Sequence, residues 1–205
     1  MRRFLGLFAL AAILSFPAIA QTGAADGPPT LWVDLPPVYQ PAAHNPSDGK
    51  FKLGNRTIEF EKTKLTALAS DIKMPVGERG DASTSLHWVC MHAANQRIWL
   101  TSDEIGGGKI DGIVLATPAP GEKASKACQS APASLAKVSL PHGLSLGMTE
   151  EALRTLLGKP SYAKNGIIGY VFEQTAGQGQ VSARLWVRID GGKISALDLG
   201  QVTTL

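Results

Sequence analysis

The chain has 205 residues, of which 44% are hydrophobic and 18% are charged. This length allows one domain of ordinary size or two small ones, and the composition excludes a chain that is disordered throughout. The chain carries 20 Lys and Arg against 17 Asp and Glu, without the concentrated basic excess that a nucleic-acid partner requires.

The first 20 residues have the pattern of a secretory signal peptide. Met1-Arg2-Arg3 is a basic start, Phe4 to Phe16 is an uncharged apolar run, and Ala18-Ile19-Ala20 is a small-residue cleavage site. A membrane anchor is the alternative, but a run of about 13 residues is shorter than the roughly 20 that span a bilayer. We therefore predict that residues 1–20 are removed, and that the mature protein is periplasmic or secreted and has no membrane span.

Two later segments are unlike the rest of the chain in composition. Residues 21–50 contain six prolines, which favours an extended segment outside the core. Residues 118–141 are rich in Ala, Pro, Ser and Lys, which is typical of a linker. These two segments leave residues 51–117 and 142–205 as the predicted folded parts.

The two folded parts share a sequence pattern. Four features recur in the same order in both parts: Thr63 and Thr149; Trp88 and Tyr170; Arg97-Ile98-Trp99-Leu100 and Arg184-Leu185-Trp186-Val187; Gly107-Gly108-Lys109-Ile110 and Gly191-Gly192-Lys193-Ile194. Internal repeats of this kind are considered before a fold is assigned. They predict an internal duplication.

Each part is predicted to form one helix followed by three strands. In the second part Thr149 is a helix N-cap, Glu150 and Glu151 place negative charge in the first turn, and Gly158 ends the helix. In the first part Thr63 is the corresponding cap. The predicted strands are Leu86–Met91, Gln96–Thr101, Lys109–Ala116, Ile167–Glu173, Val181–Asp190 and Lys193–Leu199. The predicted fold class is therefore α+β, with two tandem repeats that each pack a short helix on a small antiparallel sheet of about three strands.

Cys90 and Cys128 are the two cysteines of the chain. In an oxidising compartment they are expected to form a disulfide, and two separate buried thiols are the alternative. A zinc site at His87, Cys90 and His92 is disfavoured, because alternation along one strand points His87 away from the other two. No motif in the sequence indicates a metal or another cofactor.

The second folded part resembles two families of exported proteins. The residues that carry the resemblance are Leu146-Gly147-Met148-Thr149, Leu156-Leu157-Gly158-Lys159-Pro160 and Tyr170. They are similar to a signature shared by the β-lactamase inhibitor protein and by the small lipoprotein subunit of the outer-membrane barrel assembly machine. The resemblance implies a helical element packed on a small antiparallel sheet. In the inhibitor protein two such units in tandem form one concave surface that grips a partner.

The chain departs from both of these families. It lacks the lipid-attachment cysteine of the assembly subunit, and Phe172 stands in the second repeat where Cys90 stands in the first. Neither inhibition of a β-lactamase nor a role in barrel assembly is therefore transferred to this chain.

A candidate binding surface follows from strand alternation. In Val181–Asp190 the apolar residues alternate with a polar set, so the two sets lie on opposite faces of the sheet. The predicted binding residues on the face away from the helices are Arg97, Trp99, Arg184, Trp186 and Arg188. Trp and Arg are the residue types most enriched at interface hot spots.

A structural role for the same residues is the alternative. The tryptophans would then pack on their neighbours, or the proline-rich segment would cover them, since its Trp32 and Leu35 also need a place to pack. The paired arginines would make local cation–π contacts. Trp88 and Tyr170 are predicted to be core aromatics.

The functional prediction is a non-catalytic binding module of the bacterial cell envelope, with an unidentified envelope or secreted protein as its partner. The alternative is a small exported hydrolase or ligand-modifying enzyme with His87 and Asp81 as acid and base, although no recognisable motif supplies a nucleophile. A third hypothesis is a domain that binds a second copy of itself.

Overall fold

The computed structural model describes residues 27–204 except positions 32, 37, 82, 83, 94 and 105. The predicted signal peptide, residues 1–20, and Trp32 lie outside the described residues. No helix in the described ranges is long and apolar enough to span a bilayer.

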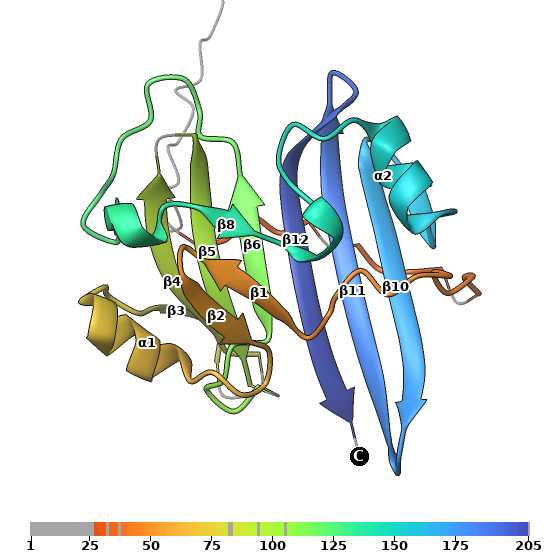
Figure 1. Ribbon diagram of the computed structural model, residues 1–205, viewed down its shortest axis with the longest axis horizontal. Coiled ribbons are helices and arrows are strands. Elements are labelled where there is room, and N and C mark those ends of the chain that lie inside the picture. The colour runs from red at the N-terminus through yellow and green to blue at the C-terminus, as the bar shows by residue number, and fades with distance from the viewer. Residues whose placement is uncertain are drawn as a thin grey trace, which may run out of the picture.

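A nine-stranded sheet dominates the molecule (Figure 1). Its strands are β3 (Gly77–Arg79), β4 (Leu86–Ala93), β5 (Gln96–Asp103), β6 (Gly112–Ala116), β7 (Cys128–Ser130), β9 (Tyr162–Lys164), β10 (Ile167–Ala176), β11 (Gly179–Asp190) and β12 (Lys193–Thr204). The order is β3-β4-β5-β6-β12-β11-β10-β9, with antiparallel neighbours throughout, and β7 pairs with β4 in parallel.

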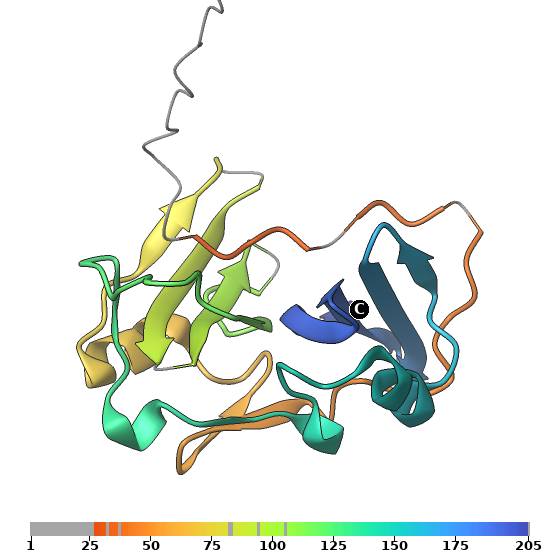
Figure 2. The same cartoon turned by 90° about the horizontal axis from the view of Figure 1, so that it is seen from above.

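Smaller elements cover one face of this sheet (Figure 2). They are α1 (Leu65–Ile72), α2 (Glu150–Leu157), the 3₁₀ turns Ala133–Leu135 and Pro141–Gly143, and a three-stranded sheet of β1 (Lys50–Leu53), β2 (Arg56–Glu59) and β8 (Val138–Ser139). We call this side the helix face. Residues 27–42 form no helix or strand where they are described, and they cross the opposite side of the sheet. We call this segment the strap, and the side that it crosses the strap face.

The structure corrects the predicted fold class. The chain is mostly β, and the strands of its two parts belong to one sheet instead of two small ones, because β6 pairs with β12 from Gly112↔Gly200 to Ala116↔Ala196. Two unjoined sheets would each expose an edge of unpaired N–H and C=O groups, and the pairing removes both edges. The division of the chain into domains at residues 117 and 142 stays a prediction.

The two short helices lie where the sequence placed them, but only one has the predicted cap. The Thr149 hydroxyl accepts a hydrogen bond of 3.1 Å from the Ala152 N–H, which caps α2. The N-cap of α1 is Lys64, whose side chain makes no capping bond. The Thr63 hydroxyl instead accepts from the Glu59 N–H at 3.0 Å, so Thr63 belongs to the turn before the helix.

The main hydrophobic core lies on the helix face. Leu65 of α1 and Leu153 of α2 are fully buried and join one cluster with Leu100, Leu185 and Leu197 of the central strands. The core therefore draws on both parts of the chain. Burial of this apolar surface stabilises the fold by roughly 25 cal/mol per Å².

Trp88 and Tyr170 are both buried, as predicted, but they lie on opposite faces. Tyr170 is in the helix-face core, whereas Trp88 packs with Trp99 and Val114 in a second cluster. The two aromatics are therefore not in equivalent places in the sheet.

The predicted disulfide between Cys90 and Cys128 is present. It joins β4 to β7, in which the two cysteines are register partners. The bond is on the strap face, in the cluster of Trp88, Trp99 and Val114. It holds the segment before β7 close to this face.

Candidate functional site

Strand alternation assigns the faces of β11 correctly. Leu185 and Val187 point into the helix-face core, whereas Trp186 packs in a separate cluster with Leu31 of the strap. Arg184 and Arg188 share the parity of Trp186 and lie on the strap face. Different segments of the chain cover the predicted binding residues of β5 and those of β11.

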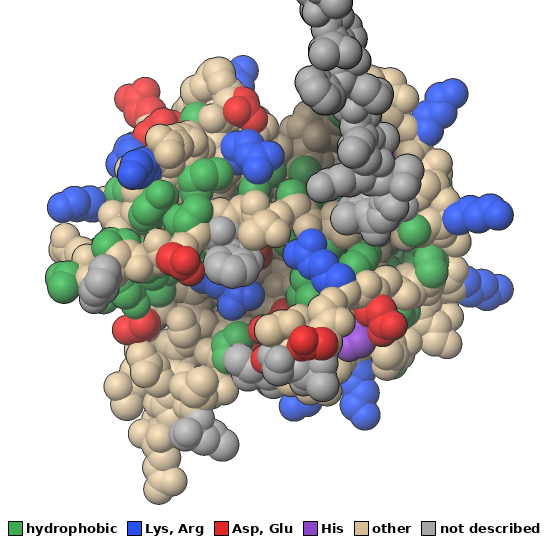
Figure 3. All heavy atoms as spheres, turned by 180° about the vertical axis from the view of Figure 1, so that it is seen from behind, with side chains coloured by type: hydrophobic (Ala, Val, Ile, Leu, Met, Phe, Trp, Pro, Cys, Tyr) green, Lys and Arg blue, Asp and Glu red, His purple; other side chains and the backbone are tan. Residues whose placement is uncertain are grey.

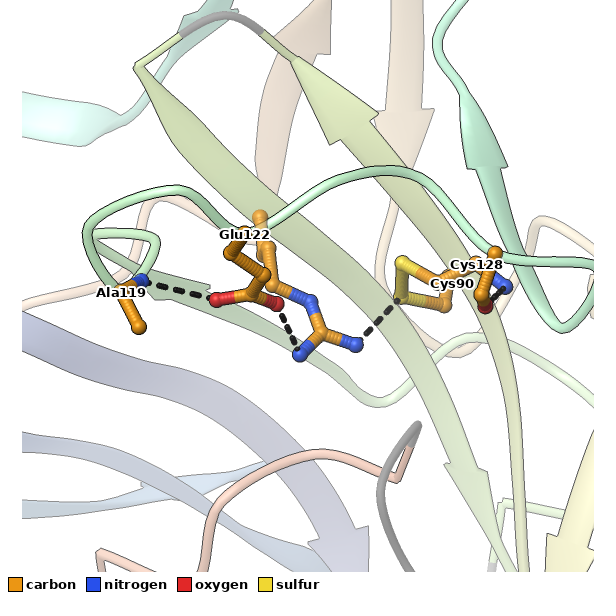
Figure 4. A network of polar contacts seen from close by, with 6 residues as sticks. Cys90, Ala119, Glu122 and Cys128 are labelled. Atoms are coloured by element: carbon orange, nitrogen blue, oxygen red, sulfur yellow. Dashed lines mark hydrogen bonds and ion pairs between the residues drawn. A yellow bond between two sulfur atoms is a disulfide. The ribbon is translucent and has the colours of Figure 1, made fainter.

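The segment before β7 lies close to Arg97, and Figure 4 shows Ala119 and Glu122 of this segment near the Cys90–Cys128 disulfide. Glu122 in that segment forms an ion pair with Arg97, with Oε1 2.6 Å from Nη1, and also accepts a bond from the Ala119 N–H at 2.8 Å. The Arg97 guanidinium lies 4.7 Å from the centre of the Trp99 ring, and Trp99 is 2% exposed. Arg97 and Trp99 therefore take part in internal packing and do not form an open surface.

Trp186 is also covered, by the strap. It is 3% exposed and clusters with Leu31, Val171 and Ala196. Its ring lies over Gly169 on the neighbouring strand, where an added Cβ would be 2.3 Å from a ring carbon. A glycine beneath the ring is therefore a requirement of this packing.

A groove remains open on the strap face beside Trp186, and we call it the central groove. Its volume is about 640 Å³, within the range of small-ligand sites. The strap, the β3–β4 region, the end of β5 and two central strands contribute its lining: Val33, Asp34, Leu35, Arg79, Thr84, Ser85, Leu86, Asp103, Glu104, Val171, Ser182, Arg184 and Trp186. Figure 3 shows this face hollowed near its middle, with basic and acidic side chains around the hollow.

A glycine makes room for Arg184 in this region. Gly200 of β12 is the register partner of Arg184 and also of Gly112. A Cβ at Gly200 would be 3.2 Å from both Cζ and Nε of Arg184 and 3.0 Å from the Asp111 carbonyl oxygen. The guanidinium therefore lies across β12.

Two buried carboxyl groups lie near Arg184. Burial raises the pKa of Asp198, and the positive charge of Arg184 opposes the shift. Burial, and next the neighbouring Asp103, raise the pKa of Asp111 to about 8, again against the effect of Arg184. Asp111 accepts a 2.7 Å bond from the Asp103 N–H, and its other oxygen lies 3.3 Å from the Thr101 hydroxyl. At neutral pH Asp111 is therefore protonated and does not neutralise Arg184.

The guanidinium of Arg184 has N–H donors that are not used within the described residues. Within the described ranges its guanidinium forms neither a hydrogen bond nor an ion pair with another residue. A guanidinium has five N–H donors and no acceptor. Of the predicted binding residues, Arg184 lines the groove with donors available, Trp186 forms its wall, and Arg188 is exposed.

The residues of the enzyme alternative have other neighbours. His87 is half-exposed, with Nδ1 3.7 Å from Glu78 Oε2, and it borders a second cavity of about 360 Å³ near Asp103. Asp81 accepts a bond from the Thr84 hydroxyl at 3.2 Å. Among the described residues no group of three or more His, Cys, Asp or Glu side chains is placed to hold a metal ion.

Sequence reasoning missed several features of the groove. Asp198 is an acidic residue inside an apolar strand, and Asp111 lies between Ile110 and a strand. A charged residue in such a run signals a buried, perturbed group. The strap contributes three lining residues. The alternative in which the proline-rich segment covers the tryptophans named Leu35 among them, and Trp186 is covered in this way, whereas Val33 and Asp34 had no sequence signal.

Comparisons with known proteins add little. No protein-family model matches the chain, and no curated protein matches its sequence. A solved structure from Streptococcus mutans, described as a "putative beta-lactamase inhibitor protein", is similar with a TM-score of 0.23 and 8% sequence identity, over 75% of this chain and 90% of that one. A likeness of this size carries no inference about function, and membership of the inhibitor-protein family stays a prediction.

Proposed function

We propose that this chain is an exported, non-catalytic binding protein whose ligand site is the central groove. Arg184 carries the proposal, because it reaches a cavity of about 640 Å³ without a hydrogen-bond partner among the described residues. A buried polar group without a partner costs free energy, and so does a half-buried guanidinium to a smaller degree. A ligand that accepts its hydrogen bonds recovers that free energy.

The residues of the predicted surface have different roles in this proposal. Arg184 contacts the ligand, and Trp186, which is buried beneath the strap, supports the strap residues that line the groove. Arg97 and Trp99 keep the segment before β7 in place through the Glu122 ion pair. Arg is one of the residue types enriched in binding hot spots.

Export is the second part of the proposal. The signal-peptide pattern of residues 1–20 supports it. The Cys90–Cys128 disulfide is consistent with it, because such bonds persist in oxidising compartments. The periplasm and the external medium both meet this condition.

Blocking the groove tests the proposal. Ser182→Trp places a large side chain on a groove-lining residue of β11, and Thr175→Trp adds the same side chain to an exposed residue of β10 outside the groove. Wild type and both variants, matched in thermal stability, are used to capture partners from an envelope extract. The dissociation constant is then measured with the purified partner.

We expect the wild type and Thr175→Trp to bind the same partner equally, and Ser182→Trp to bind it at least tenfold more weakly. If Ser182→Trp keeps every partner at wild-type affinity, the groove is not the binding site.

A further inference from the structure

The chemistry around Arg184 defines the kind of ligand group that this part of the groove accepts. Ser182 and Arg184 are two residues apart on β11 and both line the groove. A hydroxyl and a guanidinium on the same side of one strand offer donors to one acceptor group. The planar guanidinium matches the two oxygens of a carboxylate.

The guanidinium of Arg184 is the group at this point that attracts an anion. Burial raises the pKa of Asp198, and it raises the pKa of Asp111 to about 8, so Asp111 does not offset the positive charge of Arg184 near neutral pH. The other charged groups of the lining are Asp34 on the strap, Arg79 on β3, and Asp103 and Glu104 at the end of β5. Asp103 donates its backbone N–H to Asp111, whose raised pKa the charge of Arg184 opposes, so Asp103 is the acid of this lining that would repel a bound carboxylate most directly.

The neighbouring wall is apolar. Val33 and Leu35 of the strap are half-buried and line the groove, and behind them lie the buried Val171 and Trp186. An apolar side chain beside the carboxylate would bury its surface there. A ligand with both features is a peptide, either at its C-terminal end or at an acidic side chain flanked by an apolar residue.

We propose that the central groove binds peptides through a carboxylate, which Arg184 and Ser182 hold while an adjacent apolar side chain packs on Val33 and Leu35 of the strap. The proposal rests on the proposed binding function and specifies the ligand class of the same site. The carboxylate accepts two hydrogen bonds from the guanidinium and one from the hydroxyl. No described residue competes for these donors of Arg184.

The competing explanation is that Arg184 serves only as a counter-ion for the buried acids. In that case the arginine stabilises the fold and has no preference for a carboxylate ligand. The two explanations differ in a measurement on the wild-type protein alone, since only a ligand site distinguishes a peptide carboxylate from the corresponding amide.

The experiment is an NMR titration of the mature protein at pH 6.5 with three acetylated tripeptides. The first is Ala-Ala-Leu with a free C-terminal carboxylate, the second is its C-terminal amide, and the third is Ala-Glu-Leu amide. The resonances followed are the side-chain Nε–H of Arg184 and the indole N–H of Trp186. The variants are Arg184→Gln and the matched control Arg188→Gln, which changes an exposed arginine on the same face of β11.

We expect a peptide with a carboxylate to shift both resonances and to bind at least tenfold more tightly than the amide. The first and third peptides show whether the C-terminus or the side chain is the preferred source. Arg188→Gln keeps this preference and Arg184→Gln abolishes it. The inference is overturned if the amide binds as well as both carboxylate peptides, if none shifts the two resonances at about 10 mM, or if folded Arg184→Gln retains the preference.

If Arg184→Gln does not fold, the comparison of carboxylate with amide on the wild type decides the inference. A negative result here leaves the proposed function intact, provided that Ser182→Trp still loses its partner. If the carboxylate preference is absent and Ser182→Trp also keeps its partner, the groove is not a binding site.

Discussion

At the scale of single residues, the same Arg-x-Trp pattern has two outcomes. Glu122 pairs with Arg97, whose guanidinium lies over the buried Trp99 ring, whereas Arg184 faces a groove without a bonded partner among the described residues. Alternation within a strand predicts which face a side chain points to. It does not predict which distant segment covers that face, because Glu122 and the strap lie far from these strands in the sequence.

Asp111 offers a residue-scale prediction for stability. Its pKa rises from 3.8 to about 8 on folding, chiefly through burial. Between these two pH values the folded state holds a proton that the unfolded state has released, so this contribution to the free energy of unfolding falls as pH rises and is lost by about pH 8. Asn at this position can make the same bonds to the Asp103 N–H and the Thr101 hydroxyl without titrating.

We therefore expect Asp111→Asn to raise the melting temperature relative to wild type, with a difference that grows from pH 5 to pH 8 and is small near pH 4. Thermal unfolding followed by circular dichroism across this range provides the measurement. A constant difference at every pH would show that Asp111 does not titrate in this way.

At the scale of elements, the sequence predicted those whose ends have local signals. The cap and acidic first turn of α2 were visible in Thr149 and Glu150, and the structure confirms both. The corresponding prediction for Thr63 was wrong, because its hydroxyl bonds to the Glu59 N–H in a turn. A threonine that precedes the apolar residues of a helix can be the N-cap or can belong to the turn before it. Only the backbone conformation distinguishes these two roles.

Removal of the α2 cap is expected to be costly. Thr149→Ala loses the bond to the Ala152 N–H and should lower the free energy of unfolding by about 1 kcal/mol. Thr155→Ala is the control, since this exposed hydroxyl bonds only to the Glu151 carbonyl within the same helix. Urea unfolding of both variants measures the difference, and equal losses would show that the Thr149 cap has no special weight.

The segment before β7 depends on the disulfide for its position. A cross-link over 38 residues is worth about 4 kcal/mol in the chain-entropy model. We expect the Cys90→Ala/Cys128→Ala variant to lose free energy of unfolding of this order. Wild type in the presence of a reductant should unfold at a similar urea concentration. A variant as stable as the oxidised wild type would show that packing of Trp88, Trp99 and Val114 holds the segment without the bond.

At the scale of the whole molecule, the sequence reading failed where strands from distant parts of the chain meet. The six predicted strands overlap β4, β5, β6, β10, β11 and β12, whereas β3, β7 and β9 were not predicted. The assembly of these strands into one sheet depends on β6 pairing with β12. Pairing uses backbone N–H and C=O groups, which every residue except proline carries, so the periodicity of the side chains does not indicate which strand edges pair. The groove is a consequence of this assembly, because its lining comes from the strap and from strands on both sides of the β6–β12 junction.

The proposed site requires that Arg184 keeps donors available in the groove of the free protein. Hydrogen exchange of the arginine Nη–H groups, followed by NMR, tests this requirement with two internal references. Arg97 pairs with Glu122 through Nη1, and Arg188 is exposed. We predict that the Arg184 Nη–H groups exchange faster than those of Arg97 and closer to those of Arg188. Protection of Arg184 equal to that of Arg97 would show that another group already occupies its donors, and would contradict the proposed site.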